Sequence, residues 1–309
     1  MSDAALENLA IEEPAGGIAP RGSFRRVLAA VFEDRLAVIG AVLVLLTAFA
    51  ALAAPWIAPQ NPYDLATLDI MDGGLAPGSA SMSGKIYWLG TDEQGRDMLS
   101  AILYGLRVSL YVAGLATLIA LAIGMVMGVT AAYFGRFVDT LIMRIVDLQL
   151  GFPSILIALI LLAVLGRGVD KVILALVLAQ WAYYARVVRS SALVESRKDY
   201  VEAARCLALS HTRIMVRHML PNCLPPLIVV ATVQIAHAIS LEATLSFLGV
   251  GVPITRPSLG LLIANGYDYL LSGPYWVAVF PGIALVLIIV GVNLVGDRLR
   301  DVLNPRLQR

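Results

Sequence analysis

The three histidines and two cysteines are the residue types of this chain most able to hold a metal ion or to attack a substrate. The histidines stand at 211, 218 and 237 and form neither an HExxH nor an HxH pattern. Cys206 and Cys223 form neither a zinc-type pair nor a disulfide framework. Since no nucleophile, base and metal set is clustered, an intramembrane enzyme is a remote alternative. We expect no catalytic residue, no metal site and no cofactor in this chain.

The chain also lacks a loop suited to the phosphates of ATP. Such a loop needs the pattern GxxxxGK[ST] between a strand and a helix, so that backbone amides face the phosphates. The nearest approach runs from Gly78 to Ile86, with one residue too many between its glycines and Ile86 in place of the hydroxyl. We interpret it as a flexible loop.

Polar side chains within apolar stretches are further candidates, because they are costly in a bilayer and often functional. Gln234 and His237 are three residues apart and share a helix face, whereas Glu242 lies about 140° around from His237. The alternative, which we favour for any single residue, is that they bridge helices or lie near an interface, as Asp147 does beside Arg144. Candidates for a translocation path are Gln180, Gln234, His237 and Glu242; other polar residues of the spans are Asp147, Gln149 and Asn293.

The composition indicates that these residues lie in a membrane protein. The chain has 309 residues, of which 59% are hydrophobic and 15% charged, and its mean hydropathy is +0.81. A soluble protein of this length would have too little polar surface to cover its core. A span needs about 20 mostly apolar residues. Six stretches qualify: Leu36–Ile57, Val108–Ala132, Thr140–Leu165, Val172–Ser191, Leu224–Leu248 and Trp276–Val295.

The distribution of basic residues predicts the orientation of these spans. Six spans put both termini on one side, and 17 of the 23 Lys and Arg residues fall on that side. Because Lys and Arg favour cytoplasmic loops, we expect the N- and C-termini inside. The fold class is therefore an all-α membrane protein with six transmembrane helices, N-in and C-in. The first span is too long, and begins too late, for a signal peptide.

The spans divide the chain into segments. Residues 1–35 form a cytoplasmic tail whose first part is acidic and without periodicity, typical of disorder. Residues 36–57 are the first transmembrane helix, and residues 58–105 form an outer segment rich in Gly, Pro, Ser and Asp. Its last piece, residues 98–104, has helical spacing and should lie on the membrane or on a partner. Residues 106–297 form the core, with a cytoplasmic loop at 192–223, and residues 298–309 a cytoplasmic tail.

The loop at 192–223 interrupts two apolar runs with charged residues, which favours a docking role. We expect Asp199 to cap a short helix of about ten residues, with Glu202 reaching back to its amide as in a capping box. The small side chains of Ala203, Ala204, Cys206 and Ala208 would allow another surface to approach closely. Ser210 should cap a second short helix that ends before Pro221. The alternative is an ordinary amphipathic interfacial helix.

The same stretch resembles the EAA loop of type I ABC importer permeases. The resemblance is carried by Glu202-Ala-Ala, a small residue at Ala208 and the Leu220-Pro221 ending. It implies a coupling helix that lies in a groove of an ATPase subunit. The family usually has Gly at the position of Ala208, so we expect docking to survive with a slightly altered helix exit. The docking residues implied are Asp199, Glu202, Ala203, Ala204, Ala208, Leu220 and Pro221.

Four further motifs are similar to the dipeptide, oligopeptide and nickel importer group, and favour its C-type permease. They are LGTDEQGRD at 89–97 with its continuation LYGLRVSL at 103–110, RIVDLQLGFP at 144–153, EATLSFLGVG at 242–251 and GDRLRDVLNP at 296–305. The resemblance implies a bacterial inner-membrane location and partners: a second homologous permease, two ATPase subunits that bind ATP and Mg²⁺, an extracytoplasmic peptide-binding protein and membrane lipid. It implies no nucleic acid.

The resemblance implies ATP-driven import of di- or oligopeptides, and similar permeases handle nickel chelates or glutathione. A different class of hypothesis is an ion-coupled secondary transporter, which would use Asp147, His237 or Glu242 as a relay. Such a transporter would have no need of a docking helix, and would move cargo without ATPase subunits. The cargo itself is set mostly by a separate binding protein.

Overall fold

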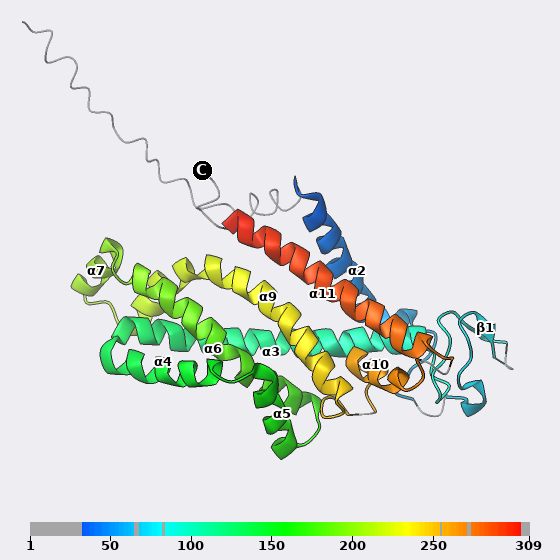
Figure 1. The fold of residues 1–309 in the computed structure, drawn as a ribbon. Coiled ribbons are helices and arrows are strands. Elements are labelled where there is room, and N and C mark those ends of the chain that lie inside the picture. The colour runs from blue at the N-terminus through cyan, green and yellow to red at the C-terminus, as the bar shows by residue number, and fades with distance from the viewer. Residues whose placement is uncertain (1–32, 65–67, 82–83, 254, 271–272, 304–309) are drawn as a thin grey trace, which may run out of the picture.

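The computed structural model describes residues 33–303, except for 65–67, 82–83, 254 and 271–272. The predicted tails at 1–32 and 304–309 lie outside the described residues. Long helices run side by side along the molecule, with short helices and a two-stranded hairpin at its ends (Figure 1). The order of the larger helices is α2 (Arg35–Ile57), α3 (Met98–Phe134), α4 (Arg136–Leu150), α5 (Ser154–Leu165), α6 (Val169–Glu195), α7 (Asp199–Cys206), α9 (Leu220–Phe247), α10 (Leu259–Tyr267) and α11 (Trp276–Leu303).

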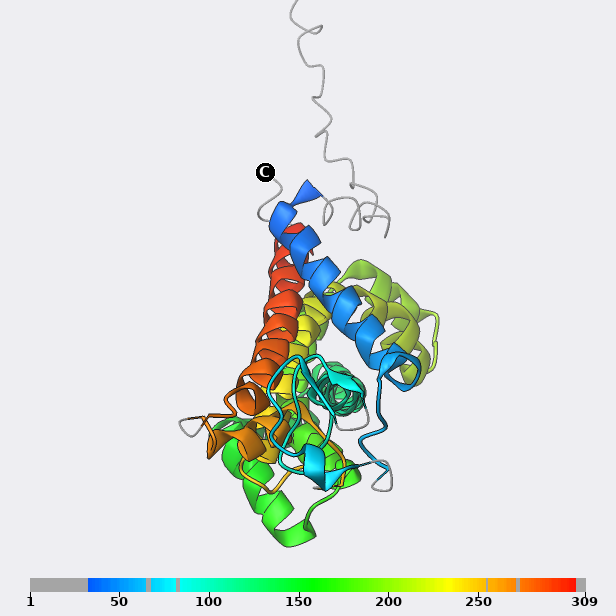
Figure 2. The same cartoon turned by 90° about the vertical axis from the view of Figure 1, so that its right-hand side faces the viewer.

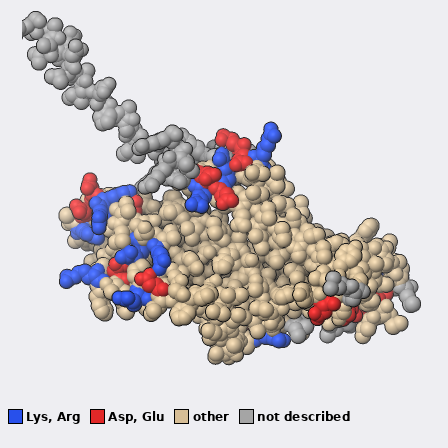
Figure 3. All heavy atoms as spheres, viewed as in Figure 1, with Lys and Arg blue, Asp and Glu red and all other residues tan. Residues whose placement is uncertain are grey.

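Among the described residues, five continuous helices are long and apolar enough to cross a membrane, and a bent pair makes a sixth candidate. The five are α2, α3, α6, the run from His211 to Phe247, and α11. The chain is therefore a multi-pass membrane protein. Its large exposed apolar side chains fit this, since in a bilayer they face lipid or a partner helix. Figure 3 shows charged side chains gathered near the ends of the helices, with a broad uncharged belt between them.

The third predicted span is not one straight helix. α4 and α5 meet at 89° across Gly151, Phe152 and Pro153. Proline cannot continue a helical hydrogen-bond ladder, and it forces the residue before it out of the helical region. The prediction of a single helix from Thr140 to Leu165 was therefore wrong, because residues 151–153 carry the breaking signal and apolar composition outweighed it.

Residues 98–104 are helical, as predicted, but the prediction that they lie on the membrane or on a partner was wrong. They form the first two turns of α3, whose N-cap is Asp97; its side chain accepts from the amide of Ser100 at 2.8 Å. Met98 and Ala101 are fully buried, so this piece lies on the chain's own core. α3 thus passes through the predicted segment boundary at residue 106.

The helix after the docking loop is longer than predicted. α8 (His211–Arg213) leads into η4 (Ile214–Met219), a π-helical segment, and η4 leads directly into α9. Pro221 lies in the first turn of α9, where it does not end a helix, so the predicted stop before it was wrong. A proline there lacks an amide donor, and the wider π-helical turn beside it accommodates the altered hydrogen bonding.

The most extensive pairing of two helices in the described part of the chain is that of α3 with α6. A Cβ added at Gly124 would lie 2.3 Å from the Cβ of Tyr184, and one added at Gly128 would lie 2.6 Å from the carbonyl oxygen of Ala185. These glycines allow close approach of two helices within this chain.

The two ends of the described chain lie together. α2 packs along α11, where a Cβ at Gly40 would meet the Cβ of Leu294 at 2.6 Å. Figures 1 and 2 show the start of α2 beside the end of α11, with α2 crossing the bundle obliquely. The two described ends therefore lie on the same side of the bundle, which agrees with the span count.

The outer segment is compact. η3 (Ile70–Asp72) precedes β1 (Ser79–Ala80), which pairs antiparallel with β2 (Ile86–Tyr87). The stretch from Gly78 to Ile86 therefore includes a hairpin, rather than the wholly flexible loop that we predicted; residues 82–83 lie outside the described part. Thr91 accepts from the amide of Leu75 at 2.8 Å and donates to the carbonyl of Asp72 at 2.6 Å, which ties the hairpin to the start of α3.

Candidate functional site

The predicted docking loop forms an elbow at one end of the molecule, made of α7, α8 and η4 (residues 199–219). Figure 1 shows α7 projecting beyond the ends of the long helices, opposite the hairpin of β1 and β2. Acidic and basic side chains lie together at this end in Figure 3. The elbow is therefore an exposed polar feature at this end of the apolar belt.

The start of α7 differs from the capping box that the sequence predicted. The N-cap is Lys198, in extended conformation, and Asp199 is the first helical residue; no side chain caps the helix. The prediction that Asp199 caps the helix was wrong by one residue. Asp199 and Glu202 instead place two exposed carboxylates in the first turn, where they interact favourably with the helix dipole.

The end of α7 depends on Ala208. Its φ of 51° is in the left-handed region. The amide of Ala208 donates to the carbonyl of Arg205 at 2.9 Å, and that of Leu209 donates to the carbonyl of Ala204 at 3.2 Å. This pair of bonds is the Schellman motif, which usually has Gly at this position. Ala208 thus adopts the conformation that glycine favours, and turns the chain sharply toward α8.

One face of α7 packs inward. Val201 is fully buried and Ala204 is 4% exposed, while Glu202 and Ala203 are exposed. Ala204 therefore contacts the core of its own chain, which corrects the prediction that it provides close approach for a partner. Its small side chain allows α7 to lie flat, and Ala203 remains as the exposed alanine of the motif.

Tyr200 fastens α7 to the helices on either side. Its hydroxyl donates to Glu195 at the end of α6 and, at 3.3 Å, to the carbonyl of His218. The amide group of Asn222 donates to the same hydroxyl at 2.9 Å. Burial and the Glu195 carboxylate raise the pKa of Tyr200 to about 12. Lys198 adds an ion pair with Glu195 at 2.6 Å.

A hollow of about 360 Å³ lies beside the elbow. The Tyr133 hydroxyl, at the end of α3, lies 2.8 Å from Nδ1 of His211, and the Arg205 guanidinium lies over the Tyr133 ring, 5.2 Å from its centroid. Ala208 and Ser210 complete the rim. Ser210 is at the N-cap position of α8, as predicted, although its side chain makes no capping bond. The elbow can therefore accept a side chain from another protein next to the Schellman turn.

The remaining predicted docking residues lie at the base of the elbow. Leu220 is half-buried against the core, and Pro221 is exposed. Sequence reasoning missed Leu207, which is 75% exposed at the C-cap of α7. An apolar side chain at the tip of a polar helix is a signal that the sequence did contain. It also missed Tyr133, whose contact with the elbow joins residues far apart in the chain.

The predicted path residues do not share one open space. Gln180 and Glu242 are fully buried, and Gln234 is 6% exposed. Gln180 donates to the carbonyl of Gln234 at 3.4 Å. His237 is half-buried, with Nε2 3.4 Å from the Ser154 hydroxyl. The role of these four residues in translocation stays a prediction, and the burial of three of them favours the helix-bridging alternative.

The buried carboxylate of Glu242 is held by hydrogen bonds from serine hydroxyls. Its carboxylate accepts from Ser109 at 2.7 Å and from Ser246 at 2.8 Å, and Ser258 also donates to it. These serines come from α3, α9 and the N-cap of α10. Hydrogen bonds from three hydroxyls offset the cost of burying the carboxylate, and they join three elements.

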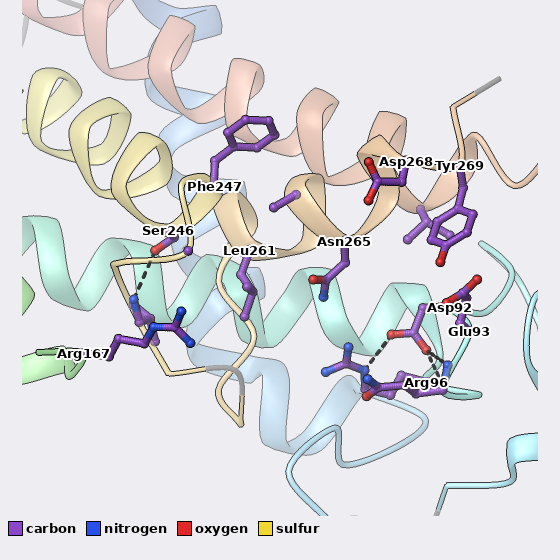
Figure 4. Close-up of a pocket in the computed structure, with 15 residues that line it drawn as sticks. Asp92, Glu93, Arg96, Arg167, Ser246, Phe247, Leu261, Asn265, Asp268 and Tyr269 are labelled. Atoms are coloured by element: carbon purple, nitrogen blue, oxygen red, sulfur yellow. Dashed lines mark hydrogen bonds and ion pairs between the residues drawn. The ribbon is translucent and has the colours of Figure 1, made fainter. Parts of the chain in front are cut away.

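A second hollow, of about 400 Å³, lies at the opposite end of the molecule (Figure 4). Asp92 and Arg96 form an ion pair at 2.6 Å on one side of it, and Arg167 lies near Ser246 on the other. Asp268 and Tyr269 complete a rim of mixed charge. Within the described ranges, no group of three or more His, Cys, Asp or Glu side chains is arranged to hold a metal ion.

Comparison with known families gives two matches that together cover most of the chain. Residues 120–309 match the family described as "Binding-protein-dependent transport system inner membrane component". Residues 23–77 match the "N-terminal TM domain of oligopeptide transport permease C". The second match contains α2, and the first contains the last part of α3, from residue 120, and every later helix, including the elbow.

Individual relatives are similar over nearly their whole length. The chain is 43% identical over 271 residues to a putative peptide transport system permease protein of Brucella suis, covering 87% of this chain and 88% of that protein. It is 40% identical over 278 residues to the dipeptide transport system permease protein DppC of Escherichia coli K12, covering 90% and 91%.

A solved structure has the same fold. The inward-facing MetNI methionine ABC transporter aligns with a TM-score of 0.54 and 20% identity, over 67% of this chain and 98% of the matched chain. At this identity the likeness concerns the fold alone. It confirms the predicted type I ABC importer permease fold.

Proposed function

Because the chain belongs to the family of binding-protein-dependent transport system inner membrane components, we propose that it is a permease subunit of an ATP-driven importer of peptides. The observation that carries this proposal is the exposed elbow at 199–219, within a chain that is similar throughout to peptide and dipeptide permeases. The match of residues 23–77 to the N-terminal domain of an oligopeptide permease adds support for peptide cargo.

The elbow is the coupling element of this proposal. The exposed face of α7, with Glu202, Ala203 and Leu207, lies in a groove of an ATPase subunit. Tyr200, Val201 and Ala204 hold α7 to the chain's own core, so that a push on the elbow moves α6 and η4 together. This requires a stiff attachment, which the bonds of Tyr200 to Glu195, His218 and Asn222 support.

The chain works with partners in this proposal. A second homologous permease completes the translocation pathway, two ATPase subunits bind ATP and Mg²⁺, and an extracytoplasmic binding protein delivers the peptide. The chain itself has no ATPase site, binds no cofactor and performs no covalent chemistry. The termini and the elbow face the cytoplasm of a bacterium, because 17 of 23 basic residues fall on that side.

Transport then follows from a shift between two conformations. ATP binding closes the ATPase subunits, their grooves carry the two coupling elements together, and the helices turn from inward-open to outward-open. The binding protein releases the peptide into the open cavity, and hydrolysis resets the inward-open state. A ligand shifts such an equilibrium only by its difference in affinity for the two states.

The ion-coupled alternative has little support from the geometry. Its relay would use Asp147, His237 or Glu242, yet Asp147 pairs with Arg186 at 2.5 Å on an exposed surface. Glu242 is enclosed by serine hydroxyls. These residues form no continuous chain of titratable groups.

The docking proposal is tested by substitutions on the exposed face of α7, one that reverses a charge and one that introduces a large side chain. Glu202→Lys and Ala203→Trp should abolish co-purification of the ATPase subunits and ATP-dependent peptide uptake into proteoliposomes. The chain should still elute as a folded species with unchanged helical circular dichroism. Ala80→Trp, at an exposed alanine on the opposite end of the molecule, is the matched control and should keep both activities. Normal ATPase association in both elbow variants would overturn the proposal.

Cargo is tested with the complete importer. Uptake of a labelled dipeptide, with unlabelled glutathione and a nickel chelate as competitors, should be blocked by excess unlabelled peptide alone. Block by either competitor at the same concentration would reassign the cargo without changing the coupling role of α7.

A further inference from the structure

A groove of about 940 Å³ runs between α2 and α3 on the side of the outer segment. Ala48, Ala51 and Leu52 form its α2 wall, and Leu110 and Tyr111 line it from α3. These walls are apolar, and Leu52 and Tyr111 are largely exposed. The groove therefore needs an apolar occupant in a membrane.

The mouth of the groove carries positive charge. Arg107 from α3 and Arg256 from the loop before α10 both line it, and both are exposed. Both lie close to Tyr63: burial raises the pKa of Tyr63, and the charges of Arg256 and Arg107 oppose that rise. The two arginines and Tyr63 thus line one groove, and no described carboxylate pairs with either arginine.

Along the bilayer normal, we place Arg107 and Arg256 at the depth of the lipid headgroups. Tyr63 packs edge-to-face on Tyr104, with ring centroids 5.1 Å apart, and Tyr104 clusters with Ala54 near the end of α2. Arg107 lies one helical turn farther along α3, toward the bilayer. Trp56, 84% exposed at the last turn of α2, is typical of a membrane interface. The cations thus lie at the boundary, with the apolar walls extending below them.

We propose that this groove binds one anionic phospholipid of the outer leaflet, with its phosphate between Arg107, Arg256 and Tyr63 and an acyl chain between α2 and α3. The site does not depend on the identity of the cargo. Guanidinium groups bind phosphate oxygens with charge-assisted, often bidentate hydrogen bonds. The apolar walls distinguish a lipid from a free phosphate ion, which would leave most of the groove empty. A zwitterionic headgroup carries the same phosphate but adds an ammonium group next to the two arginines, so an anionic headgroup fits the site better.

The lipid would have a mechanical consequence. α2 contacts the rest of the chain mainly along α11 at one end and α3 at the other. An acyl chain in the groove fills the space between α2 and α3, and stabilises the crossing angle of α2 seen in Figure 2. α2 would then be held by a component of the membrane as well as by its own chain.

The test measures lipid retained by the full chain, purified with its partner subunits from bacterial membranes in mild detergent. Mass spectrometry of extracted lipid should find about one anionic phospholipid per chain above the bulk background. Arg107→Gln and Arg256→Gln should each weaken retention about tenfold, since each removes charge-assisted hydrogen bonds. The double variant should retain none. Arg167→Gln, at another exposed arginine on the same side, is the matched control and should retain the lipid.

A second variant separates lipid from other anions. Ala48→Phe places bulk in the apolar part of the groove and leaves both arginines in place, and it should also lose the lipid. Retention of lipid by the double arginine variant would overturn the proposal. So would absence of lipid from the wild-type complex, which would mean that the partner permease occupies the groove. Binding of inorganic phosphate that Ala48→Phe leaves unchanged would identify an ion site instead.

Discussion

The outer segment at 58–97 and the inner elbow at 199–219 are both polar insertions between apolar helices, but they use their polar residues in opposite ways. In the outer segment, Thr91, Asp92, Arg96 and Asp97 are buried and bond to one another and to the backbone. In the elbow, Glu202, Ala203 and Arg205 are exposed. Motif residues therefore build architecture at the outer end, and present a surface at the inner end.

The difference teaches how to interpret a motif in a single sequence. Buried polar residues that hydrogen-bond to one another need no partner protein, so the chain's own fold accounts for the polar residues of the LGTDEQGRD motif. Gly95 illustrates this, because its added Cβ would lie 2.0 Å from the carbonyl oxygen of Asp69. The elbow motif is different, because the side chains of Glu202 and Leu207 are exposed and, among the described residues, form no hydrogen bond or ion pair that joins α7 to another element. Motif residues that have no role in the chain's own fold are the ones that indicate an interaction with another protein.

The largest expected effect is at the outer ion pair. Asp92→Ala leaves the Arg96 guanidinium buried without its partner, which should lower the free energy of unfolding by about 3–5 kcal/mol. Thermal unfolding of the purified chain in detergent would measure it. Asp147→Ala breaks an exposed pair with Arg186 and should cost about 1 kcal/mol or less. Equal losses in the two variants would remove the distinction between the buried and the exposed pair.

The next effect is at the attachment of the elbow. Tyr200→Phe removes the hydroxyl that bonds to Glu195, His218 and Asn222, and should make local opening of α7 easier by about 1–2 kcal/mol. Hydrogen exchange of the α7 amides should accelerate about tenfold, with exchange in the outer segment unchanged. Tyr183→Phe, on the neighbouring helix and partly exposed, should leave exchange unaltered. Unchanged exchange in Tyr200→Phe would mean that the inward packing of Val201 and Ala204 alone holds the elbow.

The raised pKa of Tyr200 predicts that the stability of the attachment of α7 depends on pH. Its pKa is raised to about 12 in the folded chain, against about 10 when unfolded. The stability that it contributes is therefore fully present below pH ~10 and is lost as the pH rises through about 12. Protection of the α7 amides should fall over this range in the wild-type chain, and Tyr200→Phe should lack that part of the decline.

A smaller effect, with the opposite sign, is expected at Ala208. Since Ala208 adopts a left-handed conformation that costs an L-residue about 1 kcal/mol, Ala208→Gly should make α7 more stable by a similar amount. Ala203→Gly, inside the same helix, should weaken it by about 0.5–1 kcal/mol. Hydrogen exchange of α7 distinguishes the two. A loss of protection in Ala208→Gly would mean that the Schellman turn is not strained.

The smallest effect on stability is expected at the exposed face. Glu202→Gln should change the free energy of unfolding by no more than about 0.5 kcal/mol, because the carboxylate makes no contact that holds the fold. Unfolding followed by circular dichroism would measure it. A loss as large as that of Asp92→Ala would place Glu202 in the architecture of the chain and remove it from the docking surface.

Much of the architecture was predictable from local patterns. Apolar runs of sufficient length located the spans, since crossing a bilayer leaves few alternatives to a helix. The even number of spans predicted that the two ends of the chain lie on one side, and the EAA stretch predicted an exposed short helix. The errors were local: the cap at Lys198 instead of Asp199, the bend at 151–153 and the continuous helix through Pro221. In each case local helix propensity competes with tertiary packing, and the amino-acid composition of a segment does not show which of the two prevails.

The sequence by itself determined the class of this protein, because hydrophobic length, charge bias and motif order are properties of the chain in one dimension. Only the tertiary structure decided which polar residues face outward. Ala204 turned inward and Leu207 outward. Glu242 acquired partners from α3 and from the N-cap of α10, besides Ser246 on its own helix, and Arg107, Arg256 and Tyr63 came to line one groove. Burial and convergence depend on which helices pack together, and that is settled by contacts between residues far apart in the chain.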